Sequence, residues 1–592
     1  MKIKHLFGLA VIAAMTASCS SNEDLGTAGP GTGTNETGVG YATFTINLPS
    51  TNGTRAGNPT YEQGTLDEYD VNDVTLLIFQ KTATSKSEGD YTFVEKADLG
   101  NMAPWKKDDT ANGITASATI TAKLTDVALT GTEYYALAIL NNTTAKTGNK
   151  VKDPSTDQTY SDWNAAANAV AANFTDTSKG FYMANAPKFT SGEPETLVKI
   201  DKVYATKQKA ETNAATTIHV ERGLAKVTVA SFPTDKKPSG TKYAEDKVDI
   251  TAWKLDVTNK STFPIHKTAG LKNTNFSTIW TPSTAAVPTV PSVARFVDGS
   301  NSVFKRVYWG VDPNYSDKKY YDGDATTSPA KTALDCCNEA FNMITNNQVD
   351  GAAGDANPQY CLENTFDLNN MKQGQTTRVV FKATYTPNGI KKGDTFYKIG
   401  NSTDLWSETD LEKQIKAKAV EVLGVAETDI KVDLEANKLN EAGTRLLTVD
   451  NVKIKDSAAG FKAVSQDNID DINAKLGLKV ATPTDPIVGI ATYKSGESYY
   501  IARIKHFGDL TPWTEGQETY GKNDDAHNTN YLGRYGVLRN NWYELTVGSV
   551  SGPGTPDVPT IKPTEPDDES YKYISVSVRI LSWAKWSHSY DL

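Results

Sequence analysis

The sequence has few residues of the kinds that build catalytic or metal sites. Its 592 residues include only six histidines, scattered singly, and four cysteines. It contains no G-x-S-x-G, Walker A, G-x-G-x-x-G or H-E-x-x-H motif, which excludes the commonest recognisable hydrolase, nucleotide and metalloprotease sites. Asp322 and Asp324 lack the remaining ligands of a calcium loop. We therefore predict a protein that is not an enzyme, with no catalytic, cofactor-binding or metal-binding residues.

The chain also lacks an excess of positive charge and a long apolar run. It has 61 Lys and Arg against 71 Asp and Glu, a net charge of −10. A basic face for nucleic acid or for an anionic membrane surface is not expected from this balance. After the first 20 residues no apolar run approaches the ~20 residues that cross a bilayer. A transmembrane protein is excluded on this pattern.

The first residues have the layout of a secretion signal. Lys2 and Lys4 precede a short apolar run from Leu6 to Met15, and small residues follow up to Cys19. This ending resembles a bacterial lipobox, in which Cys19 is acylated and becomes the mature N-terminus. We predict a signal peptide over 1–18 and a lipidated Cys19, with an ordinary cleaved signal as the alternative. The precursor would then contact the membrane only through its lipid.

Alternating apolar residues predict many strands. Phe44, Ile46 and Leu48 alternate with polar residues, a period of two that fits a strand with one buried face. Further predicted strands, rich in β-branched and aromatic residues, cover 74–79, 134–140, 225–229, 378–385, 499–504, 542–547 and 573–580. The fold class is therefore all-β, mainly antiparallel, and built from β-sandwiches.

Helices are predicted in the minority. Ser161 is predicted to cap a helix through Trp163 and Phe174, Ser407 opens one that closes at Gly424, and Ser465 opens one that ends at Gly477. The last two place a helical insertion at 404–478 within a β protein.

Composition suggests where the chain divides. Pro233 to Gly240 marks a boundary near residue 235. Residues 548–570 are rich in Gly, Pro, Asp, Glu and Thr, which predicts a flexible linker that cannot fold alone. One more strand follows within 571–592. Its apolar face consists of Ile574, Val576, Val578 and Ile580.

Three cysteines remain after Cys19. Cys336, Cys337 and Cys361 lie in an oxidising compartment if the signal is correct, so Cys361 could pair with either of the others. Buried free thiols are the other alternative. No second cysteine stands at C-x-x-C spacing, which argues against zinc.

Several segments together resemble the type V fimbrilins of Bacteroidales, the Mfa1-like major fimbrial subunits. Besides the lipobox and the early strand, they are Thr54–Gly57, Tyr134–Asn141, Phe181–Asn185, Val220–Val227, Tyr360–Thr365 and Arg539–Tyr543, with the linker and terminal strand at the end. The resemblance implies two transthyretin-like β-sandwich domains. We assign these to 56–235 and to 236–547, the second carrying the insertion 404–478.

The resemblance also implies a way to polymerise. In the family, an arginine-specific protease cuts after the arginine that follows the first strand, here between Arg55 and Ala56. The cut would release 19–55, including the strand with Phe44, Ile46 and Leu48. The terminal strand of another subunit, a donor strand formed by 571–592, would fill the vacated groove.

The leading hypothesis is a structural pilin that supports adhesion and biofilm formation. Its predicted partners are copies of itself, anchor and tip or accessory fimbrial subunits, and the protease; no cofactor or nucleic acid is expected. The precursor would occupy the periplasm and outer membrane, and the mature subunit a cell-surface fimbrium. A surface glycan-binding lipoprotein of the starch-utilisation type and a secreted hydrolase on a sandwich scaffold are the alternatives.

Overall fold

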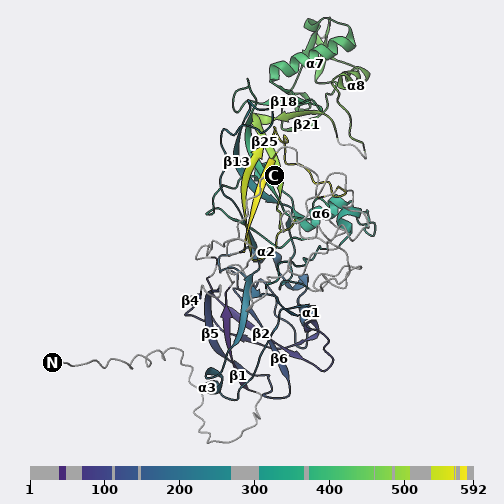
Figure 1. The fold of residues 1–592 in the computed structure, drawn as a ribbon. Coiled ribbons are helices and arrows are strands. Elements are labelled where there is room, and N and C mark those ends of the chain that lie inside the picture. Colours follow the sequence, from purple (N-terminus) through teal and green to yellow (C-terminus); the bar gives the residue numbers. More distant parts are fainter. Residues whose placement is uncertain are drawn as a thin grey trace, which may run out of the picture.

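The structure is a computed structural model of an elongated chain with two β-rich lobes and a distal helical part (Figure 1). The residues it describes are 39–48, 68, 70–109, 114–144, 148–191, 193–268, 306–315, 317–365, 372–458, 460–482, 487–506, 535–565, 567 and 574–582. Within these ranges no helix is long and apolar enough to cross a membrane.

The N-terminal lobe is built on a nine-stranded sheet. Its strands run in the order β3-β2-β6-β7-β11-β1-β5-β4, with β10 paired to β6. Their bounds are β1 (Gly40–Asn47), β2 (Val74–Lys81), β3 (Thr92–Asp98), β4 (Lys106–Asp109), β5 (Ile114–Leu124), β6 (Glu133–Leu140), β7 (Met183–Asn185), β10 (Val198–Lys199) and β11 (Thr216–Arg222). A separate hairpin pairs β8 (Lys188–Ser191) with β9 (Glu193–Glu195).

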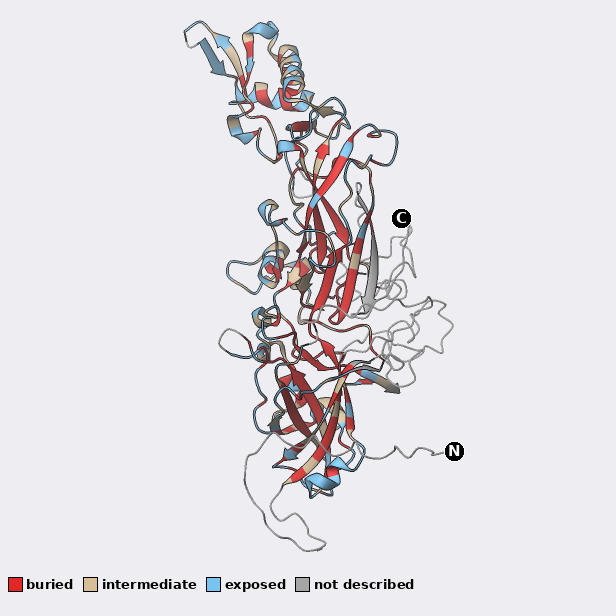
Figure 2. Cartoon of the chain, turned by 90° about the vertical axis from the view of Figure 1, so that its left-hand side faces the viewer, coloured by how far each residue is buried: buried red, intermediate tan, exposed pale blue. Residues whose placement is uncertain are grey.

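Two apolar clusters fill this lobe. One joins side chains of β1, β5 and β11 to those of β2 and β6, so the strongly bent sheet encloses a core between its two halves. The other lies on the opposite face of β2 and β6 and includes the fully buried Trp163 and Phe174. Buried residues follow the strands of both lobes (Figure 2).

The predicted helix from Ser161 to Phe174 is wrong as a single element. The structure has three short pieces, α1 (Tyr160–Trp163), a 3-10 turn (Ala166–Asn168) and α2 (Ala171–Phe174). Thr159, not Ser161, caps α1, and its hydroxyl accepts a hydrogen bond from the Asp162 N–H. The chain is extended at Ala165, and Ala169 forms a β-bridge with Val151. This long-range pairing competes with the local helical pattern.

The C-terminal lobe packs two sheets around one core. Their orders are β16-β12-β26-β27 and β13-β17-β25. The bounds are β12 (Ala225–Val229), β13 (Lys247–Asp256), β16 (Gln359–Cys361), β17 (Arg378–Thr386), β25 (Glu497–Arg503), β26 (Asn541–Val550) and β27 (Ile574–Ser582). Smaller elements at the side of this lobe are β14 (Thr258–Asn259), β15 (Phe341–Asn342), α5 (Lys319–Asp322) and α6 (Ala333–Ala340). Side chains from both sheets share one apolar cluster, as expected of a sandwich.

The predicted strands are confirmed within a few residues, and the protein is mainly β with several sheets. The transthyretin-like character of the two domains stays a prediction, as do the domain limits 56–235 and 236–547. By sheet membership the chain passes from one lobe to the other between Arg222 and Ala225, earlier than residue 235, because β12 pairs with β26 and not with β11.

The distal part contains both predicted helices of the 404–478 region. α7 (Glu408–Leu423) is capped by Ser407 and ends at Gly424, which has a φ of 65°. α8 (Gln466–Lys475) is capped by Ser465. These helices share a core with short strands, namely β18 (Phe396–Ile399), β19 (Leu405–Trp406), β20 (Ile430–Val432), β21 (Gly443–Arg445), β22 (Val452–Asp456), β23 (Gly460–Ala463) and β24 (Ile490–Tyr493).

The structure corrects the prediction of a flexible linker over 548–570. β26 extends to Val550, and the described residues after it pack on the C-terminal lobe: Ile561 is 4% exposed and Asp567 is fully buried. The composition does not allow this segment to fold alone, but a finished lobe offers it a surface. Cys336, Cys337 and Cys361 are buried free thiols, which settles their state in favour of the unpaired alternative.

Candidate polymerisation site

β1 is an internal strand of the N-terminal sheet, between β11 and β5. It pairs antiparallel with β5 over its whole length and parallel with β11 over its second half. Phe44 stands opposite Ile120 on one side and Thr216 on the other. A strand with neighbours on both sides satisfies the backbone groups of two other strands, so its loss would leave two unpaired edges.

The predicted apolar face of β1 is buried. Phe44 and Ile46 are 0% exposed and Leu48 is 1% exposed. They pack in the core that includes Leu76 of β2 and Ala138 of β6. Burying each such side chain contributes about 1.5–3 kcal/mol. The structure thus brings together the three residues that the sequence assigned to one strand face.

Both ends of β1 are held by backbone hydrogen bonds. Tyr41 and Tyr204 exchange two N–H···O bonds of 2.8 Å, and the Leu48 N–H donates to the Ala116 carbonyl at 2.9 Å. Between them, the hydroxyls of Thr43 and Thr121 are 2.8 Å apart. β1 is therefore a fully integrated strand of the lobe, not a loosely attached arm.

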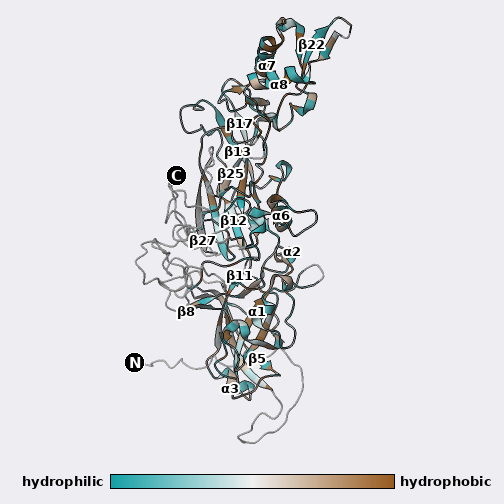
Figure 3. Cartoon of the chain, turned by 90° about the vertical axis from the view of Figure 1, so that its right-hand side faces the viewer, coloured by the Kyte–Doolittle hydropathy of each residue, from teal (hydrophilic) through white to brown (hydrophobic). Residues whose placement is uncertain are grey.

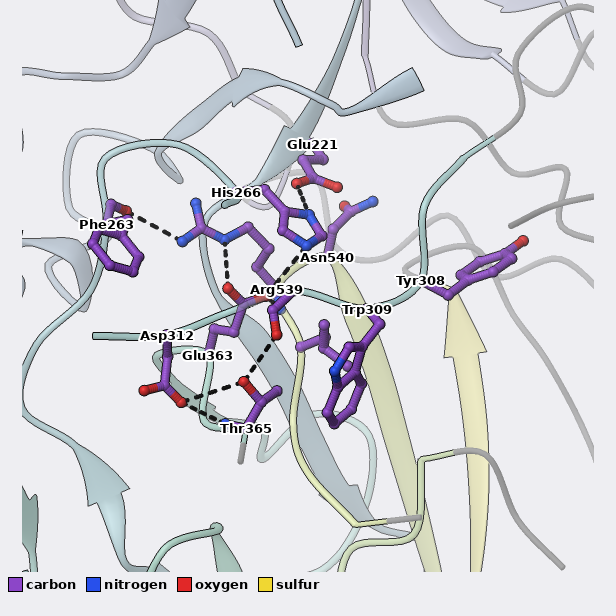
Figure 4. Close-up of polar contacts among 12 residues, drawn as sticks. Glu221, Phe263, His266, Tyr308, Trp309, Asp312, Glu363, Thr365, Arg539 and Asn540 are labelled. Atoms are coloured by element: carbon purple, nitrogen blue, oxygen red, sulfur yellow. Dashed lines mark hydrogen bonds and ion pairs between the residues drawn. The ribbon is translucent and has the colours of Figure 1, made fainter. Parts of the chain in front are cut away.

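β11, which pairs with β1, runs from that strand to the junction of the two lobes. After its segment beside β1, it ends in Glu221 and Arg222, both buried. The Glu221 carboxylate lies 2.7 Å from Nδ1 of His266 (Figure 4). The Arg222 N–H donates to Oδ1 of Asn540 at 3.2 Å. Asn540 directly precedes β26. β11, which pairs with β1, is thus hydrogen-bonded to the residue that precedes β26, and β26 is the strand that pairs with β27.

The junction is a cluster of paired buried charges. His266 lies between Glu221 and Glu363, and Arg539 lies 3.6 Å from Glu363 (Figure 4). Burial alone would disfavour the charged imidazole, but the two carboxylates raise the pKa of His266. Burial also raises the pKa of Asp312, which accepts from the Thr365 N–H, to about 7. These groups bind one another and fix the lobes together.

Glu68 holds the chain downstream of the predicted cleavage site. Its carboxylate lies 2.7 Å from Nζ of Lys226 and accepts from the Tyr360 hydroxyl at 2.7 Å. Its carbonyl accepts from Nε of Arg222. Although burial opposes ionisation, Lys226 lowers the pKa of Glu68. The segment that would remain after cleavage therefore has a fixed point at the junction.

β27 lies at the edge of the C-terminal sheet. It pairs antiparallel with β26, from Ile574 opposite Val550 to Ser582 opposite Asn541. Figure 3 labels β27 and β12, two strands of this sheet. Val576 is 7% exposed and belongs to the core of the lobe. Of the predicted donor face, Val578 and Ile580 stand opposite Leu545 and Tyr543 in the backbone register.

The predicted site residues that the structure describes fall into two groups. The removable face and the donor strand lie in different lobes, and the structure does not bring them together. Cys19, Arg55 and Ala56 lie outside the described residues. Sequence reasoning missed β11 as the second neighbour of β1, and it missed Glu68 and Asp567 as buried anchors. The alternation in Thr216–Val220 signalled a strand, but no local signal distinguished these two acids from the many on the surface.

One protein-family model matches the C-terminal part of the chain. Residues 491–589 match the model described as the C-terminal region of fimbrillin, the major fimbrial subunit protein type IV. This range contains β25, β26 and β27. A search of curated proteins gives no significant match.

Solved structures similar to this chain include fimbrial proteins. A candidate cell adhesion protein from Parabacteroides distasonis is 11% identical, with a TM-score of 0.36 over 93% of this chain and 98% of that chain. The fimbrilin FimA from Porphyromonas gingivalis is 12% identical, with a TM-score of 0.33 over 92% and 99%. The tip fimbrial protein Mfa3 from the same species, truncated at its C-terminus, is 11% identical, with a TM-score of 0.26 over 92% and 100%.

The family model carries the assignment, and the Mfa1-like subgroup stays a prediction. Over residues 491–589 the chain is therefore similar to the C-terminal region of fimbrillin, the major fimbrial subunit protein type IV.

Proposed function

We propose that this fimbrial subunit is exported as a lipoprotein, activated by cleavage after Arg55, and polymerised by donor-strand exchange. As a fimbrial subunit it would be a structural protein and not an enzyme, which the match of residues 491–589 supports. The observation that carries the proposal is the position of β1, which is buried and central and stands directly before the segment that contains Arg55. Cleavage in that segment separates β1 from the rest of the chain.

Removal of β1 would create a strong acceptor for another strand. The groove between β5 and β11 would expose the apolar surface now covered by Phe44, Ile46 and Leu48. The facing edges of β5 and β11 would lose their hydrogen-bond partners. A new strand with one apolar face would satisfy both requirements.

β27 is the strand best suited to fill the groove. It has 9 residues against the 8 of β1, and its apolar residues recur with the same period of two. In its own lobe it pairs with one neighbour, whereas the groove offers two. Exchange would therefore add a second row of backbone hydrogen bonds, each with a net value of about 1 kcal/mol. Copies of this chain are the proposed partners, with tip, anchor and accessory subunits at the ends.

Two point variants test this route. The Arg55→Ala precursor is expected to remain a monomer with β1 attached when treated with an arginine-specific protease, while the wild type forms filaments visible by electron microscopy. Arg222→Lys is unsuitable as a control because Arg222 is buried; Arg445→Lys, in the distal part, is the matched control. Filaments from Arg55→Ala would contradict the proposed activation.

Lipidation is tested in the same cells. Cys19→Ser should abolish labelling with a fatty acid, because acylation needs the thiol. The buried Cys336→Ser variant should label like the wild type. Equal labelling of Cys19→Ser would contradict a lipid on this residue.

A further inference from the structure

We propose that Asp567 pins the segment before β27 to the C-terminal lobe, so that only the chain after Asp567 changes partner during polymerisation. This inference rests on the proposed strand exchange and adds where the exchanged arm begins. Residues 551–565 and Asp567, here called the strap, connect β26 toward β27.

The first part of the strap pairs with β25. Tyr499 and Thr555 exchange two backbone hydrogen bonds of 2.8 and 2.9 Å. The carbonyls of Gly552 and Gly554 accept from the hydroxyls of two buried tyrosines at 2.9 and 3.0 Å. The strap thus extends the backbone pairing of the lobe even though its composition is that of a linker.

The middle of the strap fills an apolar site. Ile561 is 4% exposed and packs in a cluster with Val257, Tyr320, Cys337 and Phe341. The body makes room for it at Gly374, where a β-carbon would collide with the end of the Ile561 side chain and where φ is +83°. Nearby, the Val558 N–H donates to Oδ1 of Asn346 at 2.7 Å. Lifting the strap would uncover this apolar surface.

Asp567 closes the strap with a buried ion pair. Its carboxylate lies 2.8 Å from Nε of Arg503, the last residue of β25, and both side chains are at most 4% exposed. The second carboxylate oxygen accepts from the Thr376 hydroxyl at 3.1 Å. Pulling one partner out of such a pair leaves a buried charge without compensation, which is strongly unfavourable. Among the residues that the structure describes before β27, Asp567 is therefore the last one with a firm attachment to the lobe.

β27 is attached to the lobe more weakly than the strap is. β27 is an edge strand held by β26 on one side only. Release of β27 breaks one row of backbone bonds and exposes Val576, whereas release of the strap breaks its pairing with Tyr499 and the buried ion pair and exposes Ile561. Six residues of sequence separate Asp567 from β27, and six residues span at most about 20 Å. The groove of the next subunit must begin within this distance of Asp567.

Hydrogen exchange of the wild-type protein tests the fixed strap directly. We expect amides of 551–567 to stay equally protected in the cleaved monomer and in the filament. Loss of their protection in the filament would overturn the proposal, because it would show that the strap leaves with the donor strand.

The Asp567→Asn variant tests whether Asp567 attaches the strap to the C-terminal lobe. In the full-length precursor, exchange at 558–567 should become at least about tenfold faster, since charge-assisted bonds exceed the free energy that corresponds to that factor. Glu565→Gln, an exposed residue of the same strap, is the matched control and should leave exchange unchanged. Unchanged hydrogen exchange in Asp567→Asn would overturn the proposal that Asp567 holds the strap.

A disulfide between the strap and β25 tests whether the strap must detach during polymerisation. Tyr499→Cys with Thr555→Cys places cysteines on directly opposed residues, whose Cα atoms lie about 5.5 Å apart, within disulfide range. The oxidised and reduced forms of this one variant should polymerise equally after cleavage. Polymerisation of the reduced form alone would overturn the proposal. A variant that ends at Asp567 and still polymerises would instead refute the proposed donor strand, while leaving the two exchange measurements to decide the pin.

Discussion

β1 and β27 are strands of similar length and pattern that differ in their places in a sheet. β1 has β5 on one side and β11 on the other, and its apolar side chains are at most 1% exposed. Among the described strands β27 pairs with β26 alone, and Val576 is 7% exposed. The strand with two neighbours cannot leave without opening the core, whereas the edge strand can be released row by row.

This difference explains why the two strands would need different triggers. β1 is held in the lobe by its covalent connection to the rest of the chain as well as by its contacts. A protease cut removes the covalent connection, which is why β1 would need one. An edge strand needs only a better acceptor. The groove between β5 and β11 is such an acceptor because it supplies two unpaired edges at once.

The largest effect is expected from removing β27. A chain that ends at Asp567 should fold and be cleaved after Arg55 but form no filaments, because it has an acceptor groove and no donor. Electron microscopy and size-exclusion chromatography would report this. Val576→Asp together with Val578→Asp should act in the same way, and Ser575→Asp with Ser577→Asp much less. Loss of folding on truncation would show that β27 is needed by its own lobe.

Truncating single side chains should show a smaller but graded difference. Phe44→Ala in the precursor should lower the free energy of unfolding of the N-terminal lobe by about 3–5 kcal/mol, the usual cost of this change in a closed core. Val576→Ala, at the edge strand, should cost about 1.5 kcal/mol, since it removes two methyl groups. Denaturant unfolding of both variants measures the two values. A loss in Val576→Ala as large as the loss in Phe44→Ala would remove the distinction between the two strands.

The last expected effect is a pH dependence at the border of β1. His219 stands opposite Asn47 in the β1–β11 ladder, and burial, with Lys188 nearby, lowers its pKa from 6.5 to about 4. Because the folded pKa lies below the unfolded value, its contribution to stability is present above about pH 6.5 and is lost as the pH falls towards 4. Thermal unfolding of the precursor should show this slope, and His219→Gln should flatten it. An identical slope in the variant would assign the dependence to other groups.

Much of the secondary structure was predictable because its signals are local. The period of two in 42–48 and the aromatic and β-branched residues of 542–547 predicted strands that the structure contains. Ser407 and Gly424 predicted both ends of α7 because a cap depends on residues within a few positions. The segment 161–174 failed for the opposite reason, since a distant β-bridge at Ala169 overrides its helical spacing.

The sequence alone identified β1 and β27 as strands with one apolar face and placed Arg55 after the first of them. Only the tertiary structure decided that β1 is central and β27 is at an edge, because strand neighbours such as β11 and β26 are brought together from far along the chain. It likewise decided that 551–567 is a packed strap and not a linker. The anchor of that strap pairs Asp567 with Arg503, and no local pattern can reveal a partner that only the finished lobe provides.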